Sequence, residues 1–259
     1  MNSTKTMDRE KRFVLEDATG LQTYYYISPS VSPIVPGGRF PEVRGGARPS
    51  LPQGHGTFFN SSLVGLLASA AGGEETEGHA RFVAAYTSIL ADALGLRDRK
   101  TLGGLERGAL LHDIGKAGVP VAILKKPGPL TAVEREIVRE HPVLGYRMIE
   151  GLGFLEEAGE IILGHHERFD GTGYPRGLAG QNIPLAARLF ALADTLDAIT
   201  SDRPYRRGRC FEEAFSEIAR VSGTQFDPAV VAVFLSIPAA VWRQARAGVR
   251  LPCLLPAVN

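Results

Sequence analysis

The chain has 259 residues, of which 44% are hydrophobic and 22% are charged, and its formal net charge is +1. This is the composition of an ordinary globular protein, and no global basic field marks it as a binder of nucleic acid polymers or membrane surfaces. Its two cysteines, Cys210 and Cys253, form no CxxC pair, which argues against a zinc ribbon or a disulfide scaffold and fits a reducing cytoplasm.

Residues 1–56 are predicted to form an N-terminal arm or linker. Residues 12–27 favour two short strands around Ala18-Thr19-Gly20, so a small hairpin is expected there. Residues 28–56 are rich in Pro, Gly and Ser, as is typical of linkers. The N-terminus lacks the apolar segment of a signal peptide, and no apolar run is long enough to span a bilayer. The main domain boundary is therefore expected near residue 57.

Residues 57–259 are predicted to form an all-α domain, because apolar residues recur at helical spacing and strand signals are weak. The expected helices cover residues 75–96, 105–114, 131–148, 155–166, 186–201, 211–221 and 228–235. Thr131-Ala132-Val133-Glu134 has the form of a capping box, and Asp227-Pro228 that of an N-cap followed by a first-turn proline. Pro142 is expected to kink or restart its helix.

The strongest chemical signal is the dipeptide His112-Asp113, at the end of a predicted helix. An imidazole nitrogen and a carboxylate are two different metal-ligating groups, and a carboxylate can bridge two ions. The dipeptide alone occurs often by chance, so its meaning depends on the residues that accompany it.

Six other residues of ligand type lie in predicted helices or at their ends: Glu75, His79, His141, His165, His166 and Asp194. Glu75 and His79 are four residues apart, on one helix face. His165-His166 directly precede a Gly- and Pro-rich loop expected over 169–185. Singly, each of the six has a simpler explanation, as a solvated carboxylate or a hydrogen-bonded core histidine. Together they favour a metal centre, because burying so many ionisable groups is costly unless they are paired or coordinate a metal.

Motifs spread over residues 75–237 share the residues and the order of a known family. They are Glu75-Thr76 with His79, His112-Asp113-Ile114-Gly115-Lys116, Lys126–Thr131, His141-Pro142, His165–Pro175, Ala193–Ala198, Thr200–Arg206 and Gly223–Pro228. The chain thus resembles the HD-GYP family, a branch of the HD-domain phosphohydrolases whose substrates are bacterial cyclic dinucleotides, chiefly cyclic di-GMP. The resemblance implies an all-α, HD-type helical bundle over residues 57–259.

The resemblance also implies roles for the matching residues of ligand type. Two metal ions would be held by His112, Asp113, His141, His165, His166 and Asp194, with Asp113 bridging them. Glu75 and His79 match the ligands of a third ion in some members, although Glu77 and Gly78 depart from the residues common between them. Two or three divalent ions, iron and/or manganese, are therefore the expected cofactors.

Four residues match substrate-binding positions of the family: Lys116, Tyr174, Arg203 and Arg206. Lys116, with Asp113, is expected to be catalytic and to stabilise charge on the scissile phosphate; its simpler explanation is a helix C-terminal charge. The arginines carry planar forks that suit bidentate phosphate binding, but alone they would be surface charges. Tyr174 would line the pocket or pack the loop. Asp170 and Asp197 are expected to orient the histidines or to cap the loop.

The activity implied by the resemblance is hydrolysis of cyclic di-GMP to pGpG and/or GMP through a metal-bridging hydroxide, in bacterial signalling and in the cytoplasm. A homodimer or a signalling partner protein is expected to regulate it, and neither a nucleic acid polymer nor a membrane is an expected partner. Three alternatives stay open. They are a phosphohydrolase of another cyclic dinucleotide such as cyclic GMP-AMP, a non-catalytic module that binds cyclic di-GMP, and a purely structural helical domain.

Overall fold

The computed structural model describes residues 11–16, 22–27, 77–202 and 207–248. The chain divides into two units, Met1–Ala47 and Arg48–Asn259. The first unit contains strands β1 (Lys11–Glu16) and β2 (Gln22–Ile27), which pair antiparallel with Phe13 opposite Tyr25. These strands correspond to the hairpin expected over residues 12–27. The domain boundary expected near residue 57 lies outside the described residues.

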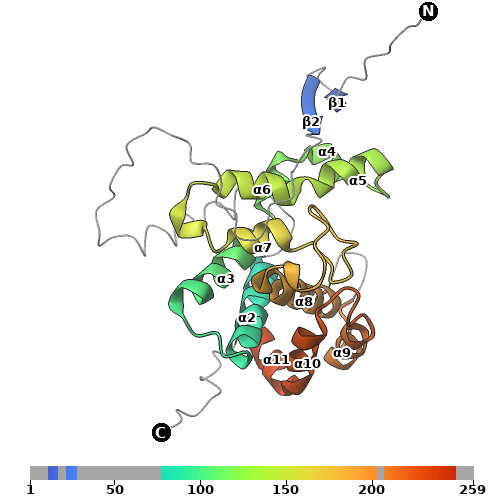
Figure 1. Cartoon of the computed structure of the whole chain (residues 1–259). Helices are drawn as coiled ribbons and strands as arrows, with labels where there is room; N and C mark the ends of the chain where they lie inside the picture. Colours follow the sequence, from blue (N-terminus) through green and yellow to red (C-terminus); the bar gives the residue numbers. More distant parts are fainter. Residues whose placement is uncertain (1–10, 17–21, 28–76, 203–206, 249–259) are drawn as a thin grey trace, which may run out of the picture. The chain divides into compact units, whose positions relative to one another are not determined.

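The described part of the second unit is helical, which confirms the predicted fold class (Figure 1). Its helices are α2 (Glu77–Ala93), α3 (Arg99–Leu111), α4 (Val121–Leu124), α5 (Ala132–Arg139), α6 (His141–Ile149), α7 (Gly159–Gly164), α8 (Leu185–Thr200), α9 (Phe211–Arg220), α10 (Pro228–Ser236) and α11 (Ala239–Arg246). Short 3-10 turns cover Ile114–Gly118, Gly153–Leu155 and Gly180–Asn182.

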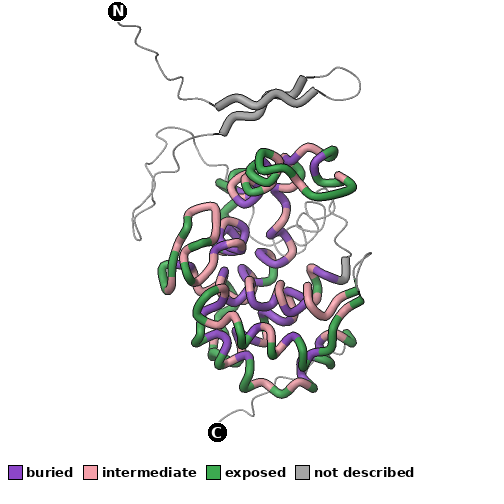
Figure 2. Tube along the Cα trace, turned by 90° about the vertical axis from the view of Figure 1, so that its right-hand side faces the viewer, coloured by how far each residue is buried: buried purple, intermediate pink, exposed green. Residues whose placement is uncertain are grey.

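The core of the helical unit forms around α2 and α8, which pack against each other and against α3, α9, α10 and α11. Figure 2 shows the buried residues concentrated inside this bundle. Tyr86 of α2, Phe190 of α8 and Trp242 of α11 are fully buried in one apolar cluster. Burying a large apolar side chain stabilises a fold by about 2 kcal/mol. The cluster therefore holds α2 and α8 firmly in place.

Two helix starts follow the predicted capping chemistry. At α5, the Thr131 hydroxyl accepts a hydrogen bond from the Glu134 N–H, and the Glu134 carboxylate accepts one from the Thr131 N–H. At α10, the Asp227 side chain accepts from the Ala229 N–H and Pro228 occupies the first turn. Pro142 lies in the first turn of α6, so the helix restarts there as predicted.

Several helical details differ from the sequence prediction; among them, α4 was not expected and α3 begins at Arg99 rather than 105. Helix α3 ends at Leu111 rather than 114, because the chain turns through a 3-10 segment where Gly115 passes against the backbone of α6. Helix α7 begins at Gly159, since residues 153–155 form a separate 3-10 turn. Helix α11 was not expected; it follows Pro238, and the apolar run before that proline concealed it.

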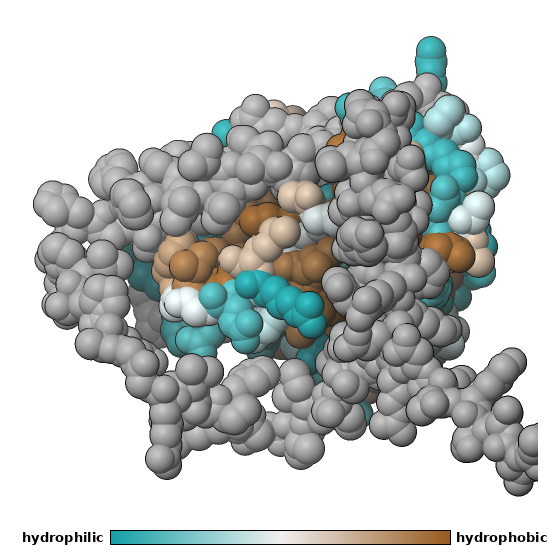
Figure 3. Space-filling model, turned by 90° about the horizontal axis from the view of Figure 1, so that it is seen from above, coloured by the Kyte–Doolittle hydropathy of each residue, from teal (hydrophilic) through white to brown (hydrophobic). Residues whose placement is uncertain are grey.

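Large apolar side chains remain exposed on the helical unit. On α4, α5 and α6 they are Val121, Leu124, Val133 and Met148. Figure 3 shows apolar side chains gathered beside hydrophilic ones on the face seen from above. No single helix among the described residues is long and apolar enough to cross a membrane; α10 and α11 meet that test only as a pair, bent by 86°.

Candidate metal centre

Seven predicted ligands converge from five helices in the middle of the helical unit. They are His79 from α2, His112 and Asp113 after α3, His141 at the start of α6, His165 and His166 after α7, and Asp194 from α8. Glu75, Arg203 and Arg206 lie outside the described residues. The convergence brings together side chains more than a hundred residues apart in sequence.

Six of these side chains form two triads. His141, His165 and His166 make one, and His79, His112 and Asp194 make the other; within each triad the ligand atoms lie within 4.8 Å of one another. Four of the five histidines are buried. Nitrogen and oxygen donors at this spacing, three to a group, form the kind of set that holds a first-row divalent ion.

Asp113 lies between the two triads. Its Oδ1 is 3.1 Å from His141 Nε2 and 3.9 Å from His165 Nε2, whereas its Oδ2 is 3.1 Å from His112 Nε2. Oδ1 is buried and accepts no hydrogen bond from the described residues. Oδ2 also accepts a hydrogen bond from Lys116 Nζ at 2.5 Å. Each oxygen thus faces one triad, which is the geometry that a bridging carboxylate requires.

The histidine rings are held in one tautomer by acceptors behind them. Nδ1 of His112 lies 2.9 Å from the Ala109 carbonyl, Nδ1 of His141 2.7 Å from the Val138 carbonyl, and Nδ1 of His165 2.9 Å from the Ile162 carbonyl. A carbonyl oxygen can only accept, so each Nδ1 carries the hydrogen and each Nε2 carries the lone pair. Metal-ligating histidines are oriented in this way in proteins.

The Nε2 atoms of His141 and His165 lie 3.1 Å apart. With both Nδ1 atoms protonated, two lone pairs face each other at that distance. They repel unless a cation or a proton lies between them. The donor set therefore fits a metal ion, as the HD-type resemblance implies.

Three of the ligands have pKa shifts that favour the protonation states that metal binding needs. Burial lowers the pKa of His166 to about 3 and holds that of His165 well below its ordinary value, so both are neutral near pH 7. Burial alone would raise the pKa of Asp113, but His112, His141 and Lys116 hold it well below its usual range. Burial raises the pKa of Asp194.

A pocket of about 240 Å³ opens over this cluster. Three of the ligands, His165, His166 and Asp194, line it, and its other lining residues include Tyr174, Gly173, Thr172, Arg168, Arg139 and Gln225. The Tyr174 ring stacks on His166 at 4.6 Å between centroids, and the Arg139 guanidinium lies 5.3 Å from the Tyr174 centroid. Burial raises the Tyr174 pKa to about 12, so its phenol keeps its proton.

Residues that contact the ligands and the pocket loop fix the positions of both. Asp197 Oδ2 accepts a hydrogen bond from His79 Nδ1 at 2.6 Å, and Asp170 accepts from the Thr172 N–H; both observations agree with the expected orienting and capping roles. Sequence reasoning missed Glu167. Its buried carboxylate accepts from the backbone N–H groups of Arg176 and Leu178, which anchors the loop carrying Tyr174. Its place directly after His165-His166 was the available signal.

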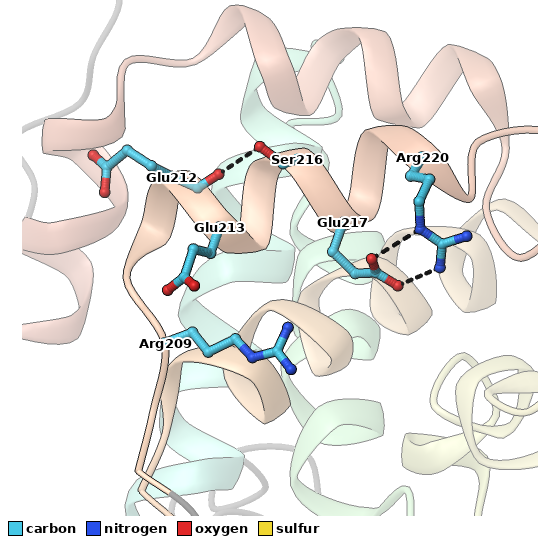
Figure 4. A pocket seen from close by; sticks show the side chains of 6 residues that line it. All are labelled: Arg209, Glu212, Glu213, Ser216, Glu217 and Arg220. Atoms are coloured by element: carbon cyan, nitrogen blue, oxygen red, sulfur yellow. Dashed lines mark hydrogen bonds and ion pairs between the residues drawn. The ribbon is translucent and has the colours of Figure 1, made fainter.

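A second depression lies on the outer surface along α9 (Figure 4). Within α9, Arg220 donates to the Glu217 carboxylate, and the Ser216 hydroxyl donates to the Glu212 backbone carbonyl. It contains none of the predicted ligands, so it is not the candidate site.

The fold and the site together define a helical protein with a two-part centre of histidines and aspartates suited to divalent metal ions. The family model described as HD domain matches residues 66–230. The chain therefore belongs to the HD-domain family.

The chain is similar to several named proteins. A "Cyclic di-GMP phosphodiesterase" of Thermotoga maritima is 41% identical over 63% of this chain and 45% of its own length. A "3'3'-cGAMP-specific phosphodiesterase 3" of Vibrio cholerae is 39% identical over 59% of this chain and 33% of its own. The solved structure of Bd1817, an HDG"Y"P protein from Bdellovibrio bacteriovorus, matches with a TM-score of 0.50 and 23% identity over 68% of this chain and 57% of its own. The chain spans less than half the length of the curated relatives named here.

Proposed function

We propose that this protein is a metal-dependent phosphodiesterase that hydrolyses cyclic di-GMP to pGpG and/or GMP. The observation that carries the proposal is Asp113, held between two ligand triads below a pocket large enough to admit a phosphate group. The names of the relatives at about 40% identity support the same chemistry and the same substrate class.

The proposed ligand sets follow the two triads. One ion would be held by His141, His165 and His166, and another by His79, His112 and Asp194. Asp113 would help to hold both ions. The resemblance implied that Glu75 and His79 hold a third ion; here His79 is proposed to share the ion of His112 and Asp194, and Glu75 would join a third ion where one is bound. Iron and/or manganese fit nitrogen and carboxylate donors. When bound, such ions supply positive charge next to the phosphate and lower the pKa of a coordinated water.

The chain's own side chains would hold the substrate and control protons. Lys116, whose ammonium pairs with Asp113, would bring positive charge to the scissile phosphate. Tyr174 would contact the ligand through a phenol that stays protonated. His165 and His166 are neutral and turned toward the centre, so neither is suited to act as a general acid. As the P–O3′ bond breaks, the departing ribose oxygen would take its proton from water. Arg203 and Arg206 would bind phosphate and base.

A second substrate is favoured by one specific observation. Relatives at 39% and 35% identity are named as phosphodiesterases specific for 3'3'-cGAMP, so cyclic GMP-AMP is the alternative substrate. A non-catalytic module that binds cyclic di-GMP is the alternative from another class, and the presence of His112, Asp113 and Lys116 argues against it. We also propose that the protein acts in the cytoplasm and that a homodimer or a signalling partner protein regulates it.

The test is anaerobic purification of the whole chain with elemental analysis, followed by hydrolysis assays on cyclic di-GMP and 3'3'-cGAMP. Wild type, His112→Ala and Asp113→Ala are compared, with Glu217→Gln on the outer face of α9 as the control. Two or three equivalents of Fe or Mn, with pGpG or GMP formed by wild type and the control alone, would support the proposal. Turnover of 3'3'-cGAMP without turnover of cyclic di-GMP would make cyclic GMP-AMP the substrate instead. Tight cyclic di-GMP binding without product, under all metal and reducing conditions, would favour the binding module.

A further inference from the structure

Asp197 is a fully buried carboxylate directly behind the candidate metal centre. Its Oδ2 accepts the hydrogen bond from His79 Nδ1 at 2.6 Å, and its Oδ1 accepts from Ser201 Oγ at 2.9 Å. A buried charge of this kind is tolerated when it is paired and its lone pairs are satisfied. The residue that pairs with Asp197 is therefore important for the orientation of His79.

The pairing comes from Arg246, the last residue of α11. Its Nη1 lies 3.0 Å from Asp197 Oδ1 and 2.9 Å from Thr200 Oγ1, and its Nη2 lies 2.7 Å from Ser201 Oγ. The planar guanidinium thus binds three acceptors on the last turn of α8 at once, a geometry that a lysine ammonium cannot reproduce. One face of the guanidinium lies over the Phe82 ring, 4.8 Å from the ring centroid.

The position of Arg246 is set by the core of the helical unit. Trp242, one turn earlier in α11, is fully buried and contacts Tyr86 and Phe234 through tilted and edge-on ring packing. Helix α11 is therefore fixed against α2 and α10. Arg246 also lies beyond residue 230, where the match to the HD-domain family ends.

We propose that Arg246 is a positioning residue for the metal centre, acting on His79 through Asp197. The guanidinium holds the Asp197 carboxylate in place. Asp197 then holds the hydrogen on His79 Nδ1 and turns His79 Nε2 toward Asp194 Oδ1, 3.4 Å away. Arg246 thereby prepares the triad of His79, His112 and Asp194, while the His141, His165 and His166 triad does not depend on it. This inference rests on the proposed metal centre.

Mn²⁺ binding to the metal-free whole chain tests the proposal, with free Mn²⁺ measured by electron paramagnetic resonance. Arg246→Met keeps the apolar stem against Phe82 and removes the charge, and Arg246→Lys keeps the charge without the fork. Arg243→Met on the same helix is the matched control, because Arg243 is exposed and pairs with the exposed Glu212. We expect Arg246→Met to weaken one class of Mn²⁺ site by about 10- to 100-fold, the usual effect of losing a residue that orients a ligand. The other class and the control should match wild type.

Two results would overturn the proposal: wild-type affinity at every site in Arg246→Met, or equal weakening of all sites together with a lower melting temperature. A double-mutant cycle with Asp197→Asn adds a second criterion. If Arg246 acts through Asp197, the double variant binds no more weakly than Asp197→Asn alone; additive losses would contradict the proposal. If Arg246→Met does not fold, Arg246→Lys is used for the same cycle.

A readout without metal separates this proposal from the proposed function. In the metal-free chain, ¹⁵N NMR of the His79 ring should show a protonated Nδ1 in wild type and Arg243→Met, and a mixture of tautomers in the Arg246 variants. Wild type that binds no Mn²⁺ would refute the metal centre. An unchanged His79 ring in the Arg246 variants would refute the positioning role whatever the metal result.

Discussion

At the scale of single residues, Asp113 must contact two groups of ligands and a lysine at the same time. Its two oxygens face different triads, and Lys116 balances its charge. Asp113→Asn keeps the shape but removes the negative charge and one acceptor oxygen. We expect metal content to fall and turnover to drop by about 100-fold or more, because a lost ligand costs at least as much as a lost orienting residue. Elemental analysis and the hydrolysis assay check this; Asp92→Asn, on the outer part of α2, should behave as wild type.

Tyr174 offers a graded test at the same scale. Its ring stacks on His166 and lines the pocket. Tyr174→Phe keeps the ring and should change kcat/KM by less than about threefold, whereas Tyr174→Ala removes the stacking and should cost about tenfold, in line with the energy of one aromatic pair. Equal losses in both variants would instead point to the hydroxyl as the important group.

Individual residues also show where sequence reasoning stops. His112, Asp113 and Asp194 could be chosen from sequence because they are polar residues in apolar helical segments. Arg246 could not, since an arginine near the end of a helix looks like a surface residue, and the only sequence signal for Glu167 was its place directly after His165-His166. Their roles depend on contacts that form only on folding, such as the approach of α11 to Asp197.

At the scale of elements, the crossing of the 3-10 turn Ile114–Gly118 with α6 positions the centre. A Cβ at Gly115 would lie 1.9 Å from the His141 carbonyl oxygen and 2.5 Å from the Gly145 nitrogen, both backbone atoms. Gly115→Ala should therefore separate Asp113 from His141 and destabilise the fold by about 1–3 kcal/mol. Urea denaturation and metal content measure this. Gly153→Ala, where a Cβ meets nothing within 4 Å, is the control.

The start of α5 provides a pH test on a carboxylate that is not a predicted metal ligand. The Lys126 ammonium and the Thr131 N–H hydrogen-bond the Glu134 carboxylate and lower its pKa from 4.5 to about 2. Because the folded pKa is the lower one, Glu134 stabilises the fold above pH 4.5, and this contribution disappears as the pH falls toward 2. The difference in unfolding free energy between wild type and Glu134→Gln should shrink over that range. A difference that does not change with pH would contradict this; Glu136→Gln is the control.

Elements were predicted best where local chemistry decides them. The capping box at Thr131, the restart at Pro142 and the N-cap at Asp227 all depend on near neighbours in sequence. The end of α3 and the start of α7 were misplaced because tertiary packing, such as the contact of Gly115 with α6, ends or shortens a helix that local spacing would continue.

At the scale of the whole molecule, metal binding should be linked to folding. The ligands come from α2, α3, α6, α7 and α8, so an unfolded chain cannot present the same centre, and an ion that binds only the folded chain stabilises it by mass action. At a free concentration of about 100 times its dissociation constant, one ion contributes about 2.7 kcal/mol. For a domain of this size, that raises the melting temperature by about 5–10 °C.

The melting temperature of the metal-free chain should therefore rise with added Mn²⁺ and fall again with excess chelator, and Asp113→Asn should respond much less. Differential scanning calorimetry at several Mn²⁺ concentrations measures both, and Glu217→Gln should follow wild type. Because the five helices that supply ligands include α2 and α8 at the centre of the core, the whole helical unit should shift as one transition. A melting temperature independent of Mn²⁺ and chelator would leave a purely structural helical domain, since the seven converging side chains would then bind no ion.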